Sequence, residues 1–280
     1  MPANKIMFDK VGVIGVGLIG GSIALAIKKR RLAREIIGLS RHKNSAFVAR
    51  RLKIIDSIAK NLDDFSDCDL VILATPVDSI IDTSMLLSKK IKGDTIVIDV
   101  GSTKEKIVTR LSGLFANFVG CHPLAGSEAR GAVNARPDIF SDSICILTPV
   151  KSTRPAVYNK IKKLWECVGA RVIIMPPDKH DQILSFISHL PHVVAFSLIR
   201  CVPDDFLKFA PTSLKDVTRI AASDPKLWQE IFLSNKRNIR IAISGFKKAV
   251  LALESAITNS ESKKIFDFLN KAKTKREKMK

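Results

Sequence analysis

Short apolar runs alternate with longer segments of mixed polarity over the first part of the chain. The apolar runs occupy residues 11–15, 36–39, 70–74, 95–100, 118–121 and 144–147. Between several of them apolar residues recur at helical spacing, at 18–27, 45–52, 78–91 and 104–114. Runs this short are typical of strands buried on both faces, and the helices provide the crossovers that a parallel sheet needs. The pattern predicts an α/β fold built on a doubly wound parallel sheet.

The pattern changes at Pro176-Pro177, because two successive prolines cannot continue a helix or a strand. A helix at 155–168 and a strand at 171–175 are expected before the prolines, and long amphipathic helices after them at 178–200, 213–222, 225–258 and from 262 onward. We therefore expect a sheet domain at 1–176 and an all-helical domain at 177–280. The continuous apolar faces of the helices favour burial against a second copy of the chain, so a homodimer is expected.

Gly15-Val16-Gly17-Leu18-Ile19-Gly20 lies between the first expected strand and its helix. In a G-x-G-x-x-G pattern the glycines permit a tight turn, close approach of a pyrophosphate and close helix–strand packing, and the helix N-terminus offers unpaired N–H groups. A ligand-free glycine turn is the alternative, but this position in the first strand–helix–strand unit favours a Rossmann-type dinucleotide-binding domain. The expected cofactor-binding residues are Gly15, Gly17, Leu18, Ile19, Gly20, Ser40, Arg41, Thr75 and Pro76.

The end of the second strand reads Ser40-Arg41-His42-Lys43. An acidic residue there would hydrogen-bond the ribose 2′-hydroxyl of NAD and repel a 2′-phosphate, whereas a hydroxyl with two cations suits that phosphate. The sequence therefore predicts NADP as the preferred cofactor and NAD as the second choice. An ordinary basic loop on a basic protein is the alternative.

The formal net charge of +19 raises the question of a nucleic-acid partner. Residues 262–280 contribute eight Lys/Arg against one Asp and one Glu, and the rest of the excess is spread over the chain. With one Tyr and two Trp, the sequence shows no interleaving of basic and aromatic residues. This distribution favours attraction of small anions over binding of nucleic acid.

Three features indicate a cytoplasmic protein without a membrane partner. No apolar run approaches the roughly 18 residues that span a bilayer. The N-terminus lacks the apolar core of a signal peptide. Five cysteines at wide spacing, with no C-x-x-C pair, are interpreted as reduced thiols.

Three segments at the carboxyl ends of expected strands face the cofactor crevice, at 75–76, 99–102 and 122–126. His122 is the histidine of this group, and its ordinary pKa of about 6.5 suits a base that accepts an alcohol proton as hydride leaves. A structural histidine is the alternative. Ser102 and Glu128 in the same crevice favour the catalytic role.

Five motifs in sequence order resemble those of the prephenate/arogenate (cyclohexadienyl) dehydrogenase family. They are the glycine loop with Gly21-Ser22, then Asp99-Val-Gly-Ser102-Thr-Lys104, His122-Pro-Leu-Ala-Gly-Ser-Glu128, Ser188-His189-Leu-Pro-His192, and Lys215-Asp216-Val-Thr-Arg219-Ile-Ala continued by Asp224-Pro225-x-x-Trp228. The likeness runs from Val11 to about Lys236. It implies a Rossmann domain, a helical dimerisation domain, and oxidative decarboxylation of prephenate or arogenate in tyrosine biosynthesis, with hydride transfer to NAD(P).

The resemblance also implies roles for single residues. His122 matches the catalytic histidine on the ring 4-hydroxyl, Ser102 the hydroxyl that helps orient that ring, and Arg219 the guanidinium that binds a carboxylate of the dicarboxylate substrate. Other pocket positions are matched by His189, His192, Glu128, Asp216 and Trp228. Residues 209–214 depart from the glycine-rich stretch that many members carry, which leaves open prephenate versus arogenate and any feedback by tyrosine.

Three alternatives concern these residues. A β-hydroxyacid-type NAD(P)-dependent dehydrogenase would share the glycine loop and the helical second domain, but it would use a lysine on the long helix, where none follows Lys179 before residue 200. His189 and His192, three residues apart, could bind a metal, yet no third ligand is evident and no metal is expected. Arg219 could form a surface ion pair with Asp216.

Overall fold

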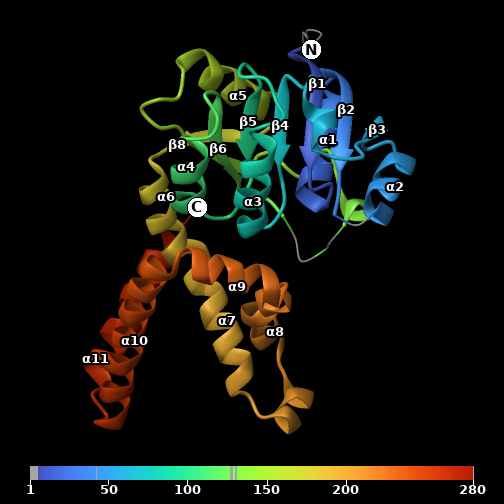
Figure 1. The fold of residues 1–280 in the computed structure, drawn as a ribbon. Coiled ribbons are helices and arrows are strands. Elements are labelled where there is room, and N and C mark those ends of the chain that lie inside the picture. Colours follow the sequence, from blue (N-terminus) through green and yellow to red (C-terminus); the bar gives the residue numbers. More distant parts are fainter. Residues whose placement is uncertain (1–5, 42, 127–128, 130, 280) are drawn as a thin grey trace.

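The computed structural model describes residues 6–41, 43–126, 129 and 131–279, and its N-terminal part is built on one eight-stranded sheet (Figure 1). The strands are β1 (Phe8–Ile14), β2 (Ala33–Leu39), β3 (Ser57–Ile58), β4 (Leu70–Leu73), β5 (Ile96–Asp99), β6 (Phe118–Pro123), β7 (Ile144–Thr148) and β8 (Arg171–Ile174). Their order is β3-β2-β1-β4-β5-β6-β7-β8. The chain builds outward from β1 to β3 and then crosses back to β4, so the direction of winding reverses between β1 and β4. In such sheets ligands bind at the carboxyl ends of the strands beside this reversal.

Helices cover both faces of the sheet, as the doubly wound prediction requires. They are α1 (Leu18–Lys29), α2 (Lys43–Arg51), α3 (Val77–Leu87), α4 (Glu105–Leu111) and α5 (Pro155–Cys167). Alternate residues of β4 point to opposite faces: Leu70 and Ile72 pack in the cluster that contains α1, and Val71 and Leu73 in the cluster that contains α3. All four are fully buried. The predicted fold class is confirmed.

The pair β6–β7 is antiparallel, which corrects the expectation of a wholly parallel sheet. Among the described residues between these strands, the 3-10 helix η2 (Ala132–Asn134) stands in place of a crossover helix. Without a crossover, the next strand runs in the opposite direction. The connection instead passes alongside α1, where the backbone N–H of Arg136 donates to Oγ of Ser22 (2.9 Å). The chain that follows His122 therefore lies next to the glycine loop and its helix.

The C-terminal part is helical. It consists of α6 (Pro177–Leu184), the π-helical segment η3 (Ser185–His189), α7 (Leu190–Cys201), α8 (Thr212–Thr218), α9 (Pro225–Ser234), α10 (Lys236–Thr258) and α11 (Ser262–Glu277). This part also contains the 3-10 helices η4 (Asp204–Phe209) and η5 (Arg219–Ala222), whereas η1 (Leu62–Phe65) lies between β3 and β4. The helix predicted at 225–258 is divided into α9 and α10 at Asn235, whose φ of −112° and ψ of 29° are not helical. Apolar periodicity continues through the joint, so the pattern alone did not reveal it.

One helical run passes the length and hydropathy test for a membrane span, which corrects the expectation that none would. It covers Pro177–Cys201, which is 25 residues, and an 18-residue window within it has a mean hydropathy of 1.5. Its apolar window is only 22% buried. The same run carries His180, Asp181 and His189, which are buried and hydrogen-bonded within the protein. Length and composition therefore do not distinguish a membrane span from a helix that carries site residues and leaves apolar surface exposed.

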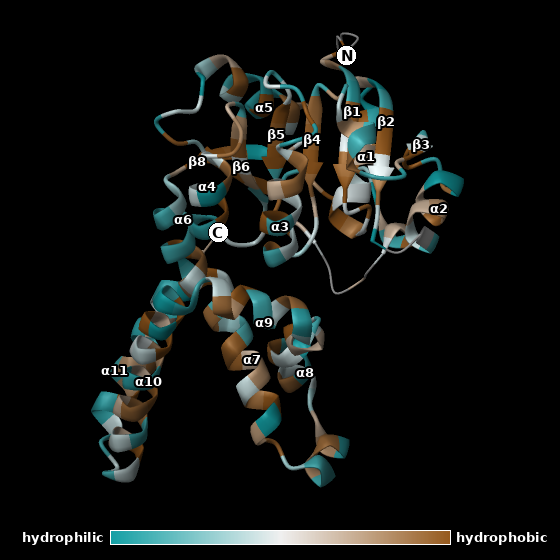
Figure 2. Cartoon of the chain, viewed as in Figure 1, coloured by the Kyte–Doolittle hydropathy of each residue, from teal (hydrophilic) through white to brown (hydrophobic). Residues whose placement is uncertain are grey.

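The helices α10 and α11 pack side by side and extend away from the sheet domain (Figure 1). Figure 2 shows hydrophobic colouring concentrated in the strands, with hydrophobic and hydrophilic residues mixed along α10 and α11. Large apolar side chains on these two helices are exposed, among them Ile241, Phe246, Val250, Leu251 and Phe266. A single chain therefore leaves apolar surface on the helical half in contact with water.

Candidate active site

The glycine loop has the shape that a pyrophosphate requires. Gly15 has a φ of +98°, and a Cβ on it would lie 2.5 Å from the carbonyl oxygen of Ala74, so only glycine fits the turn. A Cβ on Gly20 would collide with the carbonyl oxygen of Gly15. A Cβ on Gly17 would meet nothing within 4 Å. The loop is thus tightly packed toward the sheet and open at Gly17.

The first turn of α1 offers uncompensated donors beside this opening. Gly17 is the N-cap residue, no side chain caps the helix, and no acidic residue lies in its first turn. The N–H groups of Leu18, Ile19 and Gly20 are therefore placed to bind an anion. Beside Gly15, Oγ1 of Thr75, which follows β4, is buried and has no hydrogen-bond partner among the described residues. These features fit the phosphates and sugar of a dinucleotide.

The residues after β2 lie next to the loop. Oγ of Ser40 accepts a hydrogen bond from the backbone N–H of Val16 (3.2 Å), which leaves the hydroxyl hydrogen free to be donated. Arg41 is exposed, and His42 lies outside the described residues. Pro76, also exposed, is the N-cap residue of α3. The structure therefore places the predicted cofactor-binding residues at the neighbouring carboxyl ends of β1, β2 and β4.

His122, near the end of β6, forms a hydrogen-bonded relay with the helical half. Its Nδ1 lies 2.8 Å from Nε2 of His180 on α6. Nδ1 of His180 lies 2.8 Å from Oδ1 of Asp181. Sequence reasoning missed both His180 and Asp181. The available signal was a His-Asp pair in the first turns of a helix that begins at the predicted domain boundary.

The relay fixes which nitrogen of each ring carries the proton. A carboxylate only accepts, so Nδ1 of His180 donates to Asp181 and Nε2 of His180 is the acceptor. Nδ1 of His122 must then donate to His180. A neutral imidazole has one proton, so Nε2 of His122 is left with a lone pair. His122 is thereby prepared to accept a proton at Nε2.

Asp181 is itself held in place by the chain that carries Ser102. The backbone N–H groups of Lys104 and Glu105 donate to its two carboxylate oxygens (2.7 and 3.0 Å). The ammonium group of Lys104 binds Asp99 at the end of β5, and both side chains are fully buried. The β5–α4 connection, which contains Ser102, is therefore tied to the relay through Asp181.

Burial keeps the histidines of this site neutral. Desolvation, followed by the charges of His180 and Lys104, holds the pKa of His122 well below its ordinary value. Desolvation lowers the pKa of His180 to about 2, with Lys104 adding to the effect. The ordinary pKa expected for His122 from the sequence is thus corrected downward, which enlarges the pH range over which it can act as a base.

His189 and His192 line the site from the π segment and α7. The ring of His192 stacks on Trp228 with centroids 3.5 Å apart and an interplanar angle of 22°, and His189 meets the same indole edge-on. Desolvation lowers the pKa of His192, and the charge of Arg219 adds to the effect. Arg219 is exposed and begins η5, which packs against α7, the helix that carries His192. Desolvation lowers the pKa of His189 to about 4.

The remaining predicted site residues have fewer described contacts with the histidines of the site. Ser102 is half-buried in the β5–α4 connection, and no hydrogen bond among the described residues joins it to His122. Asp216 is exposed on α8, and no described contact joins it to the histidines. Glu128 lies outside the described residues. Within the described part of the chain, no group of three His, Cys, Asp or Glu could hold a metal ion.

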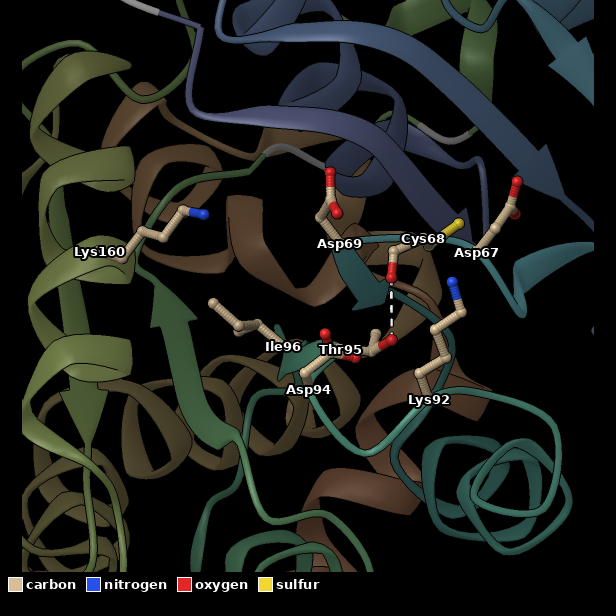
Figure 3. A pocket seen from close by; sticks show the side chains of 8 residues that line it. All are labelled: Asp67, Cys68, Asp69, Lys92, Asp94, Thr95, Ile96 and Lys160. Carbon is tan, nitrogen blue, oxygen red and sulfur yellow. Dashed lines mark hydrogen bonds between the residues drawn. The ribbon is translucent and has the colours of Figure 1, made fainter.

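A depression of 240 Å³ lies elsewhere, at the amino ends of β4 and β5 (Figure 3). Its lining residues are Asp67, Cys68, Asp69, Lys92, Asp94, Thr95, Ile96 and Lys160. Oγ1 of Thr95 donates to the carbonyl oxygen of Cys68 there (2.9 Å), and Asp67 pairs with Lys10. Since His122 and the glycine loop lie at the carboxyl ends of the strands, this depression is on the opposite edge of the sheet.

Two family models match successive parts of the chain. A family model described as the nucleotide-binding domain of prephenate dehydrogenase matches residues 23–174, and one described as its dimerization domain matches residues 176–271. The chain belongs to the prephenate dehydrogenase family. The resemblance inferred from the five motifs is confirmed.

Several members of the prephenate dehydrogenase family are similar over most of their length. Prephenate dehydrogenase of Bacillus subtilis is 33% identical over 97% of this chain and 76% of its own. Cyclohexadienyl dehydrogenase of Zymomonas mobilis is 32% identical over 91% of this chain and 90% of its own. The crystal structure of prephenate dehydrogenase from A. aeolicus, in complex with hydroxyphenyl propionate and NAD+, has a TM-score of 0.93 and 34% identity, and covers 99% of this chain and 100% of that chain.

The open face of Gly17 generates a prediction about nucleotide binding. Gly17→Ala should leave the free energy of unfolding within about 1 kcal/mol of the wild type, since its φ of −98° suits alanine. The added methyl group should weaken dinucleotide binding at least tenfold, or about 1.4 kcal/mol, as measured by nucleotide fluorescence titration. Gly15→Ala is the contrasting variant, because it should lower the unfolding midpoint itself. Unchanged dinucleotide affinity in Gly17→Ala would place the pyrophosphate elsewhere.

Proposed function

We propose that this chain catalyses the NAD(P)-dependent oxidative decarboxylation of a cyclohexadienol, prephenate or arogenate, to 4-hydroxyphenylpyruvate or tyrosine in tyrosine biosynthesis. The observation that carries the proposal is the His122–His180–Asp181 relay, which leaves an unprotonated Nε2 at the carboxyl end of β6. The glycine loop stands at the carboxyl end of β1 in the same sheet. Family membership supports the assignment.

The chemistry asks for a base, a hydride acceptor and a fixed substrate. When bound, the nicotinamide accepts the hydride from C4 of the ring. His122 takes the hydroxyl proton at Nε2, while His180 and Asp181 hold the imidazole in the tautomer that can accept it. The C1 carboxylate leaves as carbon dioxide as its bonding electrons enter the ring, and the proton held by His122 returns to the phenol oxygen. The gain of aromaticity drives the last step.

Prephenate and arogenate each carry two carboxylates, one on the side chain and one at C1. The enzyme therefore needs hydrogen-bond donors in fixed positions to bind them. Arg219 offers planar paired donors that lysine could not reproduce. It begins η5, which packs against α7, where His192 stacks on Trp228. Ser102, on the connection tied to Asp181, orients the ring beside the nicotinamide. Glu128 and Asp216 complete the pocket in this proposal.

NADP is proposed as the preferred cofactor, with NAD as an acceptable second. Ser40 presents its hydroxyl beside the glycine loop, and Arg41 is exposed next to it with no acidic residue at the end of β2. This arrangement suits a 2′-phosphate. The A. aeolicus relative, which was crystallised with NAD+, supports a nicotinamide cofactor in general.

The active form is proposed to be a cytoplasmic homodimer without a nucleic-acid or membrane partner. Exposed apolar side chains on α10 and α11, and the low burial of the Pro177–Cys201 run, provide the surface that a second copy would cover. The match of residues 176–271 to a dimerization domain supports this arrangement. The apolar run then lies in a protein interface, where its buried histidines keep their partners.

Turnover should depend on His122 and substrate affinity on Arg219. Purified enzyme with prephenate or arogenate and NAD or NADP should produce reduced nicotinamide, measured by its absorbance. His122→Asn should lower kcat by about 10² to 10⁴ while dinucleotide affinity stays unchanged. Arg219→Gln should raise the substrate KM with a smaller effect on kcat. Turnover of neither substrate, or full activity in His122→Asn, would refute the function proposed.

The pH profile should show the lowered pKa of His122. Activity requires a neutral imidazole, so protonation of His122 in acid abolishes activity. Because burial lowers the pKa of His122, kcat/KM should stay level as the pH falls through about 6.5. It should decline only at a pH well below that value. Initial rates between pH 8 and pH 5 test this. An acid limb centred at or above the ordinary histidine value would show that His122 is not desolvated.

The cofactor preference should depend on Arg41. Arg41→Ala should raise the KM for NADP roughly tenfold, the loss of one charge-assisted contact, and leave the KM for NAD nearly unchanged. Arg34→Ala, a variant of an exposed arginine paired with Asp9, is the matched control and should change neither value. A wild-type enzyme that uses NAD as well as NADP would refute the preference.

A further inference from the structure

Asn235, at the joint between α9 and α10, connects Asp181 of the relay to His189. The side chain is 4% exposed. Its amide nitrogen donates to the backbone carbonyl of Asp181 (2.7 Å) and lies 3.2 Å from Nδ1 of His189. Its amide oxygen accepts from the side chain of Asn238 (2.8 Å). All three polar contacts of this buried amide are thereby accounted for.

These contacts determine the orientation of the amide and the tautomer of His189. The carbonyl oxygen of Asp181 only accepts, and Asn238 supplies a donor to the opposite side, so the nitrogen of Asn235 must face Asp181 and His189. An amide nitrogen only donates, so Nδ1 of His189 is the acceptor. The proton of neutral His189 therefore resides on Nε2.

The tautomer of His189 is complementary to that of His122. The relay leaves Nε2 of His122 as an acceptor, whereas Asn235 makes Nε2 of His189 a donor. The amide of Asn235 joins His189 to Asp181, which is hydrogen-bonded through His180 to His122. The ring of His189 also meets the edge of Trp228. One site thus contains a neutral base and a neutral donor, each with its tautomer set by a hydrogen bond from another element.

We propose that Asn235 is a positioning residue that holds His189 in the Nε2–H tautomer, so that His189 donates a hydrogen bond to an anionic oxygen of the substrate. The substrate part of this inference rests on the proposed function, but the tautomer does not. Two titratable groups adjoin His189: Asp181 from α6, whose carbonyl oxygen shares the amide of Asn235, and His192 from α7, which contacts the same indole. His180 of α6 and His122 of β6 follow Asp181 along the relay.

Asn235→Asp keeps the shape of the side chain but replaces the donor that faces His189 and the carbonyl oxygen of Asp181 by an acceptor. The new carboxylate accepts from Nδ1, which moves the proton of neutral His189 away from Nε2 and raises the pKa of His189. The donor at Nε2 is then lost at high pH and restored when the ring becomes an imidazolium. The substrate KM of this variant should rise about tenfold at pH 8 and improve toward pH 6, whereas the wild-type KM stays level.

The first measurement is a long-range ¹⁵N–¹H NMR correlation of the histidine rings in the full-length protein, with His189→Gln used to assign the signal. The proposal expects a proton on Nε2 of His189 in the wild type and on Nδ1 in Asn235→Asp. A proton on Nδ1 in the wild type overturns it, with no need for a folded variant or a known substrate.

The second measurement is the KM against pH for Asn235→Asp, beside Asn259→Asp as the control for an added charge on the exposed end of α10. The control should behave like the wild type. An Asn235→Asp enzyme with a level, wild-type KM would refute the link to substrate. If neither prephenate nor arogenate is turned over, the proposed function fails while the NMR result still decides the role of Asn235.

Discussion

The hydrogen bond between His122 and His180 is the interaction on which the site depends. It joins a strand of the sheet to the first helix after the predicted domain boundary, and it lies between a fully buried His180 and a partly buried His122. A buried imidazole pair is stable only if each ring is neutral and every N–H finds an acceptor. Asp181 supplies the terminal acceptor, and the backbone of the β5–α4 connection fixes Asp181. The position of the base is therefore a property of both halves of the chain.

Because the site depends on both halves of the chain, motifs considered one at a time do not show how its histidines are held. The glycine loop and His122 each lie at a strand end, where periodicity and turn chemistry identify them. The tautomer of His122, however, is set by a helix that follows in sequence only after β7, α5 and β8. The same is true of His189, whose proton position is set by the joint between α9 and α10. Chemistry at one edge of the sheet is thus controlled from the helical half.

The fold was largely predictable because alternation of apolar runs and amphipathic segments specifies a wound sheet, and Pro176-Pro177 marks the change of pattern. The antiparallel β7 was not predicted, since the missing crossover between β6 and β7 is a matter of topology that apolar runs do not report. The break at Asn235 was missed because the apolar spacing continues through it. His180 and Asp181 were missed because a His-Asp pair at the start of a helix, although visible in the sequence, gains its role only when β6 and the β5–α4 connection pack against it.

The central claim is that Nε2 of His122 faces the reacting oxygen, and a crystal structure of the enzyme with dinucleotide and 4-hydroxyphenylpyruvate tests it most directly. The account predicts that Nε2 of His122 lies at hydrogen-bonding distance, about 2.6–3.2 Å, from the phenol oxygen, with Nδ1 still bonded to His180. A phenol oxygen bound by another side chain, with the His122 ring turned away into the core, would contradict it.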